Sequence, residues 1–421
     1  MMSRDENMRP GHCPSIRPIL PDRYHMQSSP NTIWIPNAYQ SQFGLLGAMA
    51  NELLEAFTIK GYDARPHDLL NDPSPTQGVF LFMNTPQSLD QLPLALFSPG
   101  SNLKAVQLHV DHPFALPAEI LDQWNQRSTL SNLRLLLPCV DDTHLLRPRF
   151  PGLMHSCIPH GIPRSSLCNI DTLNTQEYDS REFDVVFTGS VRSQREIDTI
   201  LSQANPHVVT MITNIAHLMI KEPWLGYVAA VDLVMGSQGV ITGNWETQRS
   251  FWGIVIAIVN RHRRMETVKS MQGLKVGVFG SPAWEDQCTG TIKYAGEVSY
   301  AQCASAFARG RIALAWGPTQ FVHSYSERIM QAMAGGACVV ADDRLLVRRD
   351  FNGSASPAGD TTKLFDWGDP NAARSAADTQ LADPQASLAM AKRGRELVEA
   401  RCLWEHRVDA MVDVQKSPVT Q

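Results

Sequence analysis

The sequence predicts an α/β protein built from two Rossmann-like, doubly wound domains that follow one another and face a cleft. Short apolar segments alternate with amphipathic helical patterns, which favours parallel strands covered by helices. The alternation stops over residues 164–182, a polar stretch without pattern, and then starts again. Open α/β sheets bind ligands beyond the carboxyl ends of their strands, so two facing sheets predict a site between the domains.

The composition narrows the class of protein. A length of 421 residues suggests two to three domains, and 43% hydrophobic with 19% charged residues is typical of a water-soluble globular chain. The balance of 37 basic against 42 acidic side chains lacks the basic excess of nucleic-acid-binding proteins. The longest apolar stretch, residues 251–259, is far shorter than the roughly 20 residues of a membrane span. We therefore expect neither a nucleic-acid partner nor a transmembrane segment.

The expected cellular compartment follows from the composition of the N-terminal leader and the spacing of the cysteines. Residues 1–30 contain five prolines and are predicted to be a loosely attached leader. They lack the apolar centre of a secretory signal. The 8 cysteines include no C-x-x-C pair, which indicates free thiols rather than a disulfide framework or a zinc site. We expect a cytoplasmic protein.

The first domain is predicted over residues 31–163. It opens with an apolar strand, 32–36, and a helix over 43–60 that Gly61 ends. Further strands are expected at 79–83, 105–110, 133–137 and 153–158, with a helix around 117–126.

The second domain is predicted over residues 183–390, after the linker 164–182. Its first strand, 183–187, leads into a Thr-Gly-Ser turn, after which Ser193 and Glu196 have the spacing of a capping box. Two more strands are expected, at 274–279 and 312–316. A long amphipathic helix is predicted over 388–414, and residues 391–421 are assigned as a C-terminal crossover helix and tail.

A second capping box is predicted at Ser324 and Glu327. A helix should then begin near Tyr325 and end at one of the two glycines 335–336, before a strand over 338–341. The amino end of a helix has free N–H groups and suits a diphosphate. Arg328 lies in this first turn. The alternative is a capped helix whose charged residues are merely solvated.

Other segments are candidates for the same ligand. Gly189 and Ser190 end a strand, where a phosphate could approach the backbone closely, and Arg192 could add positive charge. A tight turn of purely structural importance is the alternative. A nucleotide base could be framed by Lys293, Gly296 and Val298. For Lys293, a surface lysine in a loop is the equally good alternative. The basic cluster 261–264 is either a solvated helix end or a phosphate contact.

The first domain offers acceptor-side candidates. Asp111 and His112 follow a strand and should face the cleft, where a carboxylate or an imidazole can act as a general base. Successive strand residues alternate faces, so one of the two could point away from the site. His160 also follows a strand at the cleft, with a structural turn as the alternative.

Several motifs of the second half resemble GT-B glycosyltransferases, and more closely their spore-maturation-protein (CgeB-like) branch. The resemblance covers roughly residues 183–415 and is specific in order and spacing. Its motifs are a D-V-x-F-x-G-S strand, an R…L…v-x-G…W segment that starts at the basic helix end with Arg261 and Arg264, a Y-x-G-x-V segment, a k-I-x-L-N segment and an R-x-F-E-x-x-A-C-G segment. They are found here at 184–190, 261–284, 294–298, 311–314 and 328–336.

The resemblance implies a GT-B fold whose C-terminal helix returns to the first domain, and a glycosyltransferase activity. The second domain would bind a nucleotide-diphospho-sugar as co-substrate, and the first an unidentified acceptor, with no essential metal or other cofactor. Arg328 would stabilise the leaving diphosphate, and Asp111 or His112 would take the acceptor proton if the reaction inverts. Donor-side residues would also include His323, Ser324, Glu327 and Gln331.

One position departs from the family pattern. Gln331 stands where relatives carry a glutamate that holds the donor ribose, and the retaining Glu-x7-Glu pair falls on His323 and Gln331. An amide can still form hydrogen bonds at this position. Two alternatives stay open, namely a binding or scaffold protein that has lost turnover and a nucleotide-sugar epimerase of the same fold.

Overall fold

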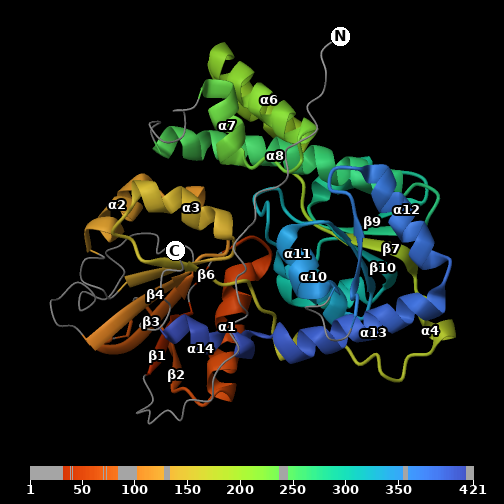
Figure 1. Cartoon of the computed structure of the whole chain (residues 1–421), viewed down its shortest axis with the longest axis horizontal. Helices are drawn as coiled ribbons and strands as arrows, with labels where there is room; N and C mark the ends of the chain where they lie inside the picture. Colours follow the sequence, from red (N-terminus) through yellow and green to blue (C-terminus); the bar gives the residue numbers. More distant parts are fainter. Residues whose placement is uncertain are drawn as a thin grey trace.

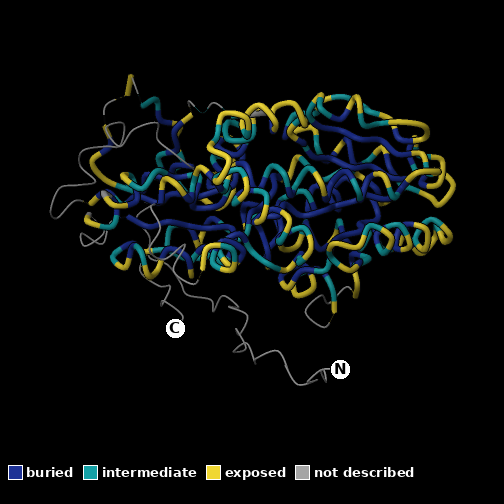
Figure 2. Tube along the Cα trace, turned by 90° about the horizontal axis from the view of Figure 1, so that it is seen from above, coloured by how far each residue is buried: buried dark blue, intermediate teal, exposed yellow. Residues whose placement is uncertain are grey.

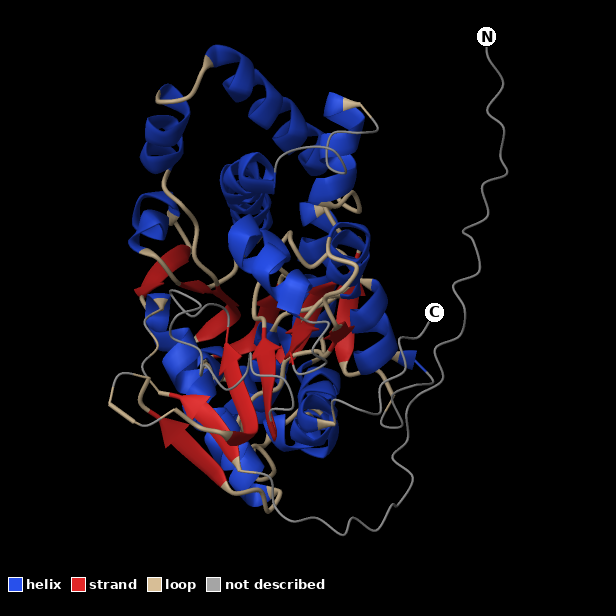
Figure 3. Ribbon diagram, turned by 90° about the vertical axis from the view of Figure 1, so that its left-hand side faces the viewer, coloured by secondary structure: helices blue, strands red, loops and turns tan. Residues whose placement is uncertain are grey.

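The computed structural model describes residues 32–37, 39, 41–69, 71–72, 74–83, 102–127, 133–236, 245–353 and 359–413. These residues form two six-stranded sheets, and every strand pair is parallel. Helices flank both sheets (Figures 1 and 3). The predicted α/β architecture of two doubly wound domains is confirmed. The predicted leader, residues 1–30, lies outside the described residues.

The first sheet has the strand order β2-β1-β3-β4-β5-β6. Its strands are β1 (Ile33–Pro36), β2 (Ala64–His67), β3 (Gln77–Met83), β4 (Asn102–Leu108), β5 (Leu133–Leu137) and β6 (His155–Cys157). Its helices are α1 (Leu45–Ile59), α2 (Ala118–Arg127) and α3 (Val140–Arg149). The sequence analysis missed β2 and α3. Strand β2 is a partly exposed edge strand without an apolar run, and α3 is polar with Pro148 inside it.

The second sheet has the order β12-β11-β10-β7-β8-β9. Its strands are β7 (Phe183–Thr188), β8 (Val276–Phe279), β9 (Ile292–Gly296), β10 (Gly310–Ala315), β11 (Cys338–Asp342) and β12 (Thr362–Phe365). The later helices are α4 (Thr175–Asp179), α5 (Gln194–Ser202), α6 (Pro206–Lys221), α7 (Tyr227–Met235), α8 (Trp245–Ser270), α9 (Cys303–Phe307), α10 (Glu327–Ala334), α11 (Leu345–Phe351), α12 (Pro370–Leu381), α13 (Pro384–Arg401) and α14 (Val408–Val412).

The core follows the two sheets. All residues of β5 and β11 are buried, as expected of parallel strands covered on both faces. Figure 2 shows the buried segments running through the middle of both domains, with the exposed residues at the periphery. Among the described residues, no helix has both the length and the apolar character needed to cross a membrane.

The C-terminal segment returns to the first domain, as the resemblance implied. Helix α13 ends at Arg401 rather than continuing to 414, so the single long helix predicted from the sequence is wrong in this detail. The chain then pairs Leu403 with Ile162 and places α14 beside α1 (Figure 1). Tyr62 donates to Asp409 over 3.0 Å and fixes this end.

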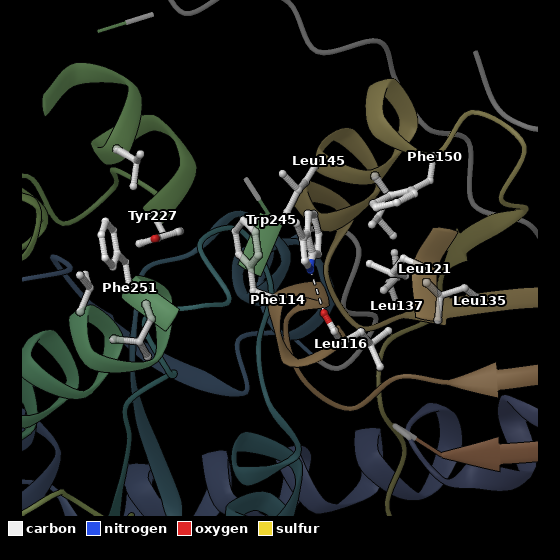
Figure 4. Packing of buried hydrophobic residues seen from close by; sticks show 14 of the residues in the cluster. Phe114, Leu116, Leu121, Leu135, Leu137, Leu145, Phe150, Tyr227, Trp245 and Phe251 are labelled. Carbon is white, nitrogen blue, oxygen red and sulfur yellow. Dashed lines mark hydrogen bonds between the residues drawn. The ribbon is translucent and has the colours of Figure 1, made fainter. Parts of the chain in front are cut away.

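A second connection between the domains was not predicted. Helices α6, α7 and the first half of α8 share one hydrophobic cluster with the helices of the first domain. Trp245 of α8 donates from Nε1 to the carbonyl of Leu116 over 2.8 Å (Figure 4). Phe114 packs against Trp245 and Tyr227, at ring-centroid distances of 4.5 and 5.6 Å. The three helices therefore extend the second domain over the top of the first (Figure 1).

A buried carboxyl group lies where the returning chain meets α1. Glu52 accepts a hydrogen bond from Trp404 Nε1 over 2.8 Å, and Tyr300 OH lies 3.5 Å from the same oxygen. Burial raises the pKa of Glu52 to about 7, although both hydrogen bonds oppose the shift. The folded protein therefore binds this proton more tightly than the unfolded chain does.

Replacing Glu52 by Gln should remove a pH-dependent loss of stability. Because the folded pKa is raised, the wild-type free energy of unfolding should fall as pH rises from about 4.5 to 7. A shift of this size corresponds to at most about 3 kcal/mol. Denaturant titrations should show that the free energy of unfolding of the variant rises relative to that of the wild type between pH 5 and pH 8. An equal difference at both pH values would contradict the prediction.

Candidate functional site

The two domains meet through a short segment of the second domain, residues 320–327, which we call the docking segment. It precedes α10 and contacts the loops that follow the strands β4, β5 and β6. At one end, Gln320 donates from Nε2 to Asp111 Oδ1 over 3.2 Å. At the other end, His160 Nδ1 lies 3.3 Å from Glu327 Oε2. The carboxyl ends of the two sheets therefore approach each other here, as the topology predicted.

The middle of the docking segment is tied to the loop after β5 and the start of α3. Ser324 donates from Oγ to the carbonyl of Pro138 over 2.8 Å. His323 Nδ1 lies 2.9 Å from both carboxylate oxygens of Asp141. The hydrogen bond to Asp141 raises the pKa of His323, and although burial raises the pKa of Asp141, the hydrogen bond to His323 lowers it overall.

The predicted capping box at Ser324 and Glu327 is wrong. Helix α10 begins at Glu327, and Ser326 is its N-cap residue without a side-chain cap. The Ser324 hydroxyl is used by Pro138 instead. The glycine prediction is confirmed, since Gly336 has φ 70° and leads into β11.

A buried ion pair fixes the chain that leads into the docking segment. Arg344 donates from Nε to Asp342 Oδ2 over 2.6 Å, and both side chains are almost fully buried. The remaining guanidinium hydrogens go to the backbone carbonyls of Gly317, Pro318 and Phe321. Asp342 accepts the Gly317 N–H over 3.1 Å. The loop after β10 is therefore held by one satisfied network of charged groups.

Arg264 contacts the loop after β7, and Arg328 is close enough for its charge to act on Arg264. Arg264 donates from Nη1 to the carbonyl of Ser190 and is 7% exposed. Burial, with the nearby charges of Arg328 and Arg344, lowers the pKa of Arg264 to about 9. Arg328 is half-buried, and among the described residues no hydrogen bond or ion pair holds its guanidinium. The positive charges of Arg264 and Arg328 therefore act on each other near the Ser190 carbonyl, and the charge of Arg328 also lowers the pKa of the neighbouring Glu327 carboxyl.

The basic cluster 261–264 is not a solvated helix end. It lies inside α8, and both Arg263 and Arg264 are buried. Arg263 donates to the carbonyl of Met219 and so has a structural role. The sequence did carry a signal for this burial, because Val255 and Val259 precede Arg263 at intervals of four on one helix face.

The turn at Gly189 is packed tightly. Its carbonyl accepts a hydrogen bond from Trp284 Nε1 over 2.6 Å, and its N–H donates to Phe279 over 2.9 Å. A Cβ atom added at Gly280 would lie 2.3 Å from the Gly189 oxygen. Glycine at 280 is therefore required by the close approach of the two strand ends.

The other predicted donor-side residues lie in different surroundings. Lys293 is exposed in the first half of the edge strand β9, Gly296 is the last residue of that strand, and Val298 follows it. Arg192 is exposed, and its carbonyl accepts a hydrogen bond from Arg261. Gln331 is buried and donates from Nε2 to the Tyr300 carbonyl over 3.4 Å, while its Oε1 has no partner.

On the acceptor side, the two neighbouring candidates differ. His112 stacks between Phe114 and Trp252, accepts the Phe114 N–H at Nδ1 and has Nε2 3.5 Å from Asp142 Oδ1. Burial lowers the pKa of His112 to about 3. Asp111 accepts hydrogen bonds at Oδ1 from the His112 N–H and Gln320, which leaves its other oxygen for a ligand. Burial raises the pKa of Asp111.

Replacing Gly280 by Ala should disturb the turn at Gly189. Overpacking a dense site typically costs about 1–3 kcal/mol, and the clash here is with backbone rather than with a flexible side chain. Gly253 in α8 is the matched control, because a Cβ there meets no atom within 4 Å. Gly253→Ala should be stabilising by about 0.5–1 kcal/mol. Thermal unfolding of both variants checks the pair, and equal stability of the two would contradict it.

Comparisons with known proteins agree with this architecture in its second half. Residues 261–413 match the family model described as glycosyl transferase-like. The chain thus carries a glycosyl transferase-like domain. No curated protein sequence matches. The resemblance to the CgeB-like branch stays a prediction.

Several solved structures align with most of this chain at low sequence identity. Sucrose-phosphate synthase from Thermosynechococcus elongatus is 12% identical over 91% of this chain and 96% of that chain, with a TM-score of 0.47. HepE from Anabaena in complex with UDP-glucose is 11% identical over 90% of this chain and 98% of that chain, also at 0.47. A glycosyltransferase from Rickettsia africae is 10% identical over 93% of this chain and 100% of that chain, at 0.46. At these scores no residue role is carried across.

Proposed function

We propose that this protein is a glycosyltransferase that moves a sugar from a nucleotide-diphospho-sugar to an acceptor bound between its domains. The observation that carries the proposal is the glycosyl transferase-like match over 261–413, which contains Arg264, the docking segment and Arg328. These residues combine two arginines, a helix start whose N-cap residue forms no side-chain cap, and contacts to titratable groups of the facing domain. The identity of the sugar, the base and the acceptor is left to experiment.

The donor diphosphate would lie between the Gly189–Ser190 turn and the start of α10. Arg264 and Arg328 supply positive charge, and the first N–H groups of α10 are free of a side-chain cap. Charge that builds on the leaving diphosphate would be stabilised by these groups. We propose that the reaction needs no metal because the arginines meet this charge, so a chelator should leave turnover unchanged.

Asp111 is the member of the predicted pair that would contact the acceptor. His112 is stacked between two rings and has its Nδ1 occupied by a backbone N–H. Asp111 keeps one carboxylate oxygen for an acceptor hydroxyl, and Gln320 holds the other across the domain boundary. His160, on the same side, lies next to this contact.

A binding protein without turnover is the second candidate. The observation that favours it is Gln331, whose amide is buried against the Tyr300 carbonyl. Its Oε1 could still accept a ribose hydroxyl, because that oxygen has no partner. A protein of this kind would bind the nucleotide and release no product.

Nucleotide sugars should raise the melting temperature of the full chain, since a ligand that binds only the folded state stabilises it. A panel of uridine, guanosine, adenosine and thymidine diphosphate sugars identifies the donor base. Arg328→Ala should then weaken binding by about 1.5–3 kcal/mol, the range for hydrogen bonds to charged groups. Calorimetry on the folded variant measures this loss.

Arg309 provides the control for this experiment. It pairs with Glu182, at the amino end of β7 and away from the proposed site, and is also an arginine of the second domain. Arg309→Ala should leave nucleotide affinity unchanged. Equal affinity of the Arg328 variant and the wild type would remove Arg328 from the donor site.

Asp111→Asn should reduce turnover and leave donor affinity unchanged. The substitution keeps the shape of the side chain but removes the negative charge that would hold the acceptor hydroxyl. Loss of a group that handles the transferred proton or its hydroxyl typically lowers turnover by about 10²–10⁴-fold. Release of nucleoside diphosphate from the selected donor measures it, and wild-type turnover in the variant would exclude Asp111 from the reaction.

A further inference from the structure

The imidazole of His160 has one nitrogen engaged and the other without a partner. Nδ1 lies 3.3 Å from Glu327 Oε2, while Nε2 is buried and forms no hydrogen bond. The residue is only 2% exposed. A buried polar atom without a partner costs about 1–3 kcal/mol, so its presence where two domains meet points to a ligand that completes it.

Glu327 determines which nitrogen carries the proton. Burial raises the pKa of Glu327, but the hydrogen bond with His160 and the charge of Arg328 outweigh burial and bring the pKa to about 2. An ionised carboxylate only accepts hydrogen bonds, so Nδ1 of His160 carries a hydrogen and donates it. In the neutral imidazole the lone pair is then on Nε2, the nitrogen without a partner.

The His160 ring packs against aromatic side chains from both domains. Phe321 and Trp404 both lie 6.3 Å from the His160 ring centroid, one from each side of the domain boundary. Several ionisable groups interact electrostatically with His160 or with its partner Glu327. They come from the loop after β4, from α10, from α1 and from residues 300–303, and they are Asp111, His109, Glu327, Arg328, Glu52, Tyr300 and Cys303.

His109 does not compete with His160 for a proton. Burial lowers the pKa of His109 to about 4, so its ring is neutral at physiological pH. Its Nε2 lies 3.0 Å from the carbonyl of His112 and is occupied. Asp111 is a carboxyl group of the first domain whose charge interacts with that of His160.

We infer that His160 is the general base of the reaction and that Glu327 positions it, an inference that rests on the proposed glycosyl transfer. The acceptor hydroxyl gives its proton to Nε2 of His160 while its oxygen bonds to the anomeric carbon of the sugar. The bond from that carbon to the diphosphate oxygen breaks, and the electron pair leaves with the diphosphate. The anomeric configuration is inverted.

Each residue then has one task. Asp111 holds the acceptor hydroxyl at its free oxygen, and His160 takes the proton. Glu327 keeps the imidazole in the tautomer that leaves Nε2 free, as carboxylates do for histidine bases. Because His160 belongs to the first domain and Glu327 to the second, the base is oriented only where the docking segment meets the first domain.

The activity test uses the full chain and the donor found by thermal shift, with water or an acceptor as nucleophile. His160→Asn should lower kcat by about 10²–10⁴-fold and leave nucleotide affinity within about threefold of the wild type. Glu327→Gln should lower kcat by a smaller factor. It should also change the tautomer of His160, because an amide can donate as well as accept a hydrogen bond at Nδ1.

His67→Asn is the matched control. His67 is also a buried histidine of the first domain, and its Nδ1 lies 3.7 Å from a carboxylate oxygen of Asp72, away from the docking segment. The control should keep wild-type kcat and an unchanged pH profile. Loss of turnover in the control to the same extent as in His160→Asn would overturn the assignment of a specific base.

A second readout does not depend on turnover. Nitrogen chemical shifts of the histidines in the full-length protein, labelled with ¹⁵N-histidine and assigned with the His160→Asn variant, report the tautomer of His160. A hydrogen on Nδ1 and none on Nε2 at neutral pH, changed by Glu327→Gln, supports the inference. If no nucleotide binds, the proposed function fails and this measurement decides alone. A hydrogen on Nε2, or full activity of His160→Asn, overturns the inference.

Discussion

The buried ion pair of Arg344 and Asp342 is the constraint on which the rest of the site depends. Desolvating two charges is costly, and here the cost is offset because the guanidinium hydrogens and the carboxylate oxygens bond to each other and to the backbone. Breaking one partner of such a pair costs about 3–5 kcal/mol. The loop after β10 is thereby limited to one conformation, and this conformation delivers the docking segment to the first domain.

Local patterns predicted the fold well where local interactions decide it. Strand β5 has the predicted bounds, 133–137, and the capping box of Ser193 and Glu196 is present with both of its hydrogen bonds. The capping-box pattern gave a wrong prediction at Ser324, because the Ser324 hydroxyl donates to a carbonyl of the other domain instead. Capping is worth about 1 kcal/mol, so a single tertiary hydrogen bond is enough to replace it.

The candidate site shows the same difference between local patterns, which the sequence reveals, and contacts between domains, which it does not. The sequence indicated Asp111, His160 and Glu327 separately, because each stands at the end of a strand or the start of a helix. It could not show that His160 and Glu327 touch, since no periodicity links residues in different domains. For Arg264 the sequence left a solvated helix end and a phosphate contact both open, and only the helical spacing of its apolar neighbours indicates burial.

The two connections between the domains also set an order of events during synthesis. The first domain leaves the ribosome before α6–α8, whose residues complete the cluster around Phe114 and Leu121. Helix α1 is covered still later, by Trp404 and α14. Domains usually fold as they emerge, amino-terminal first. In this chain the core of the first domain stays incomplete until α6–α8 are made, and α1 stays uncovered until the last helix is made.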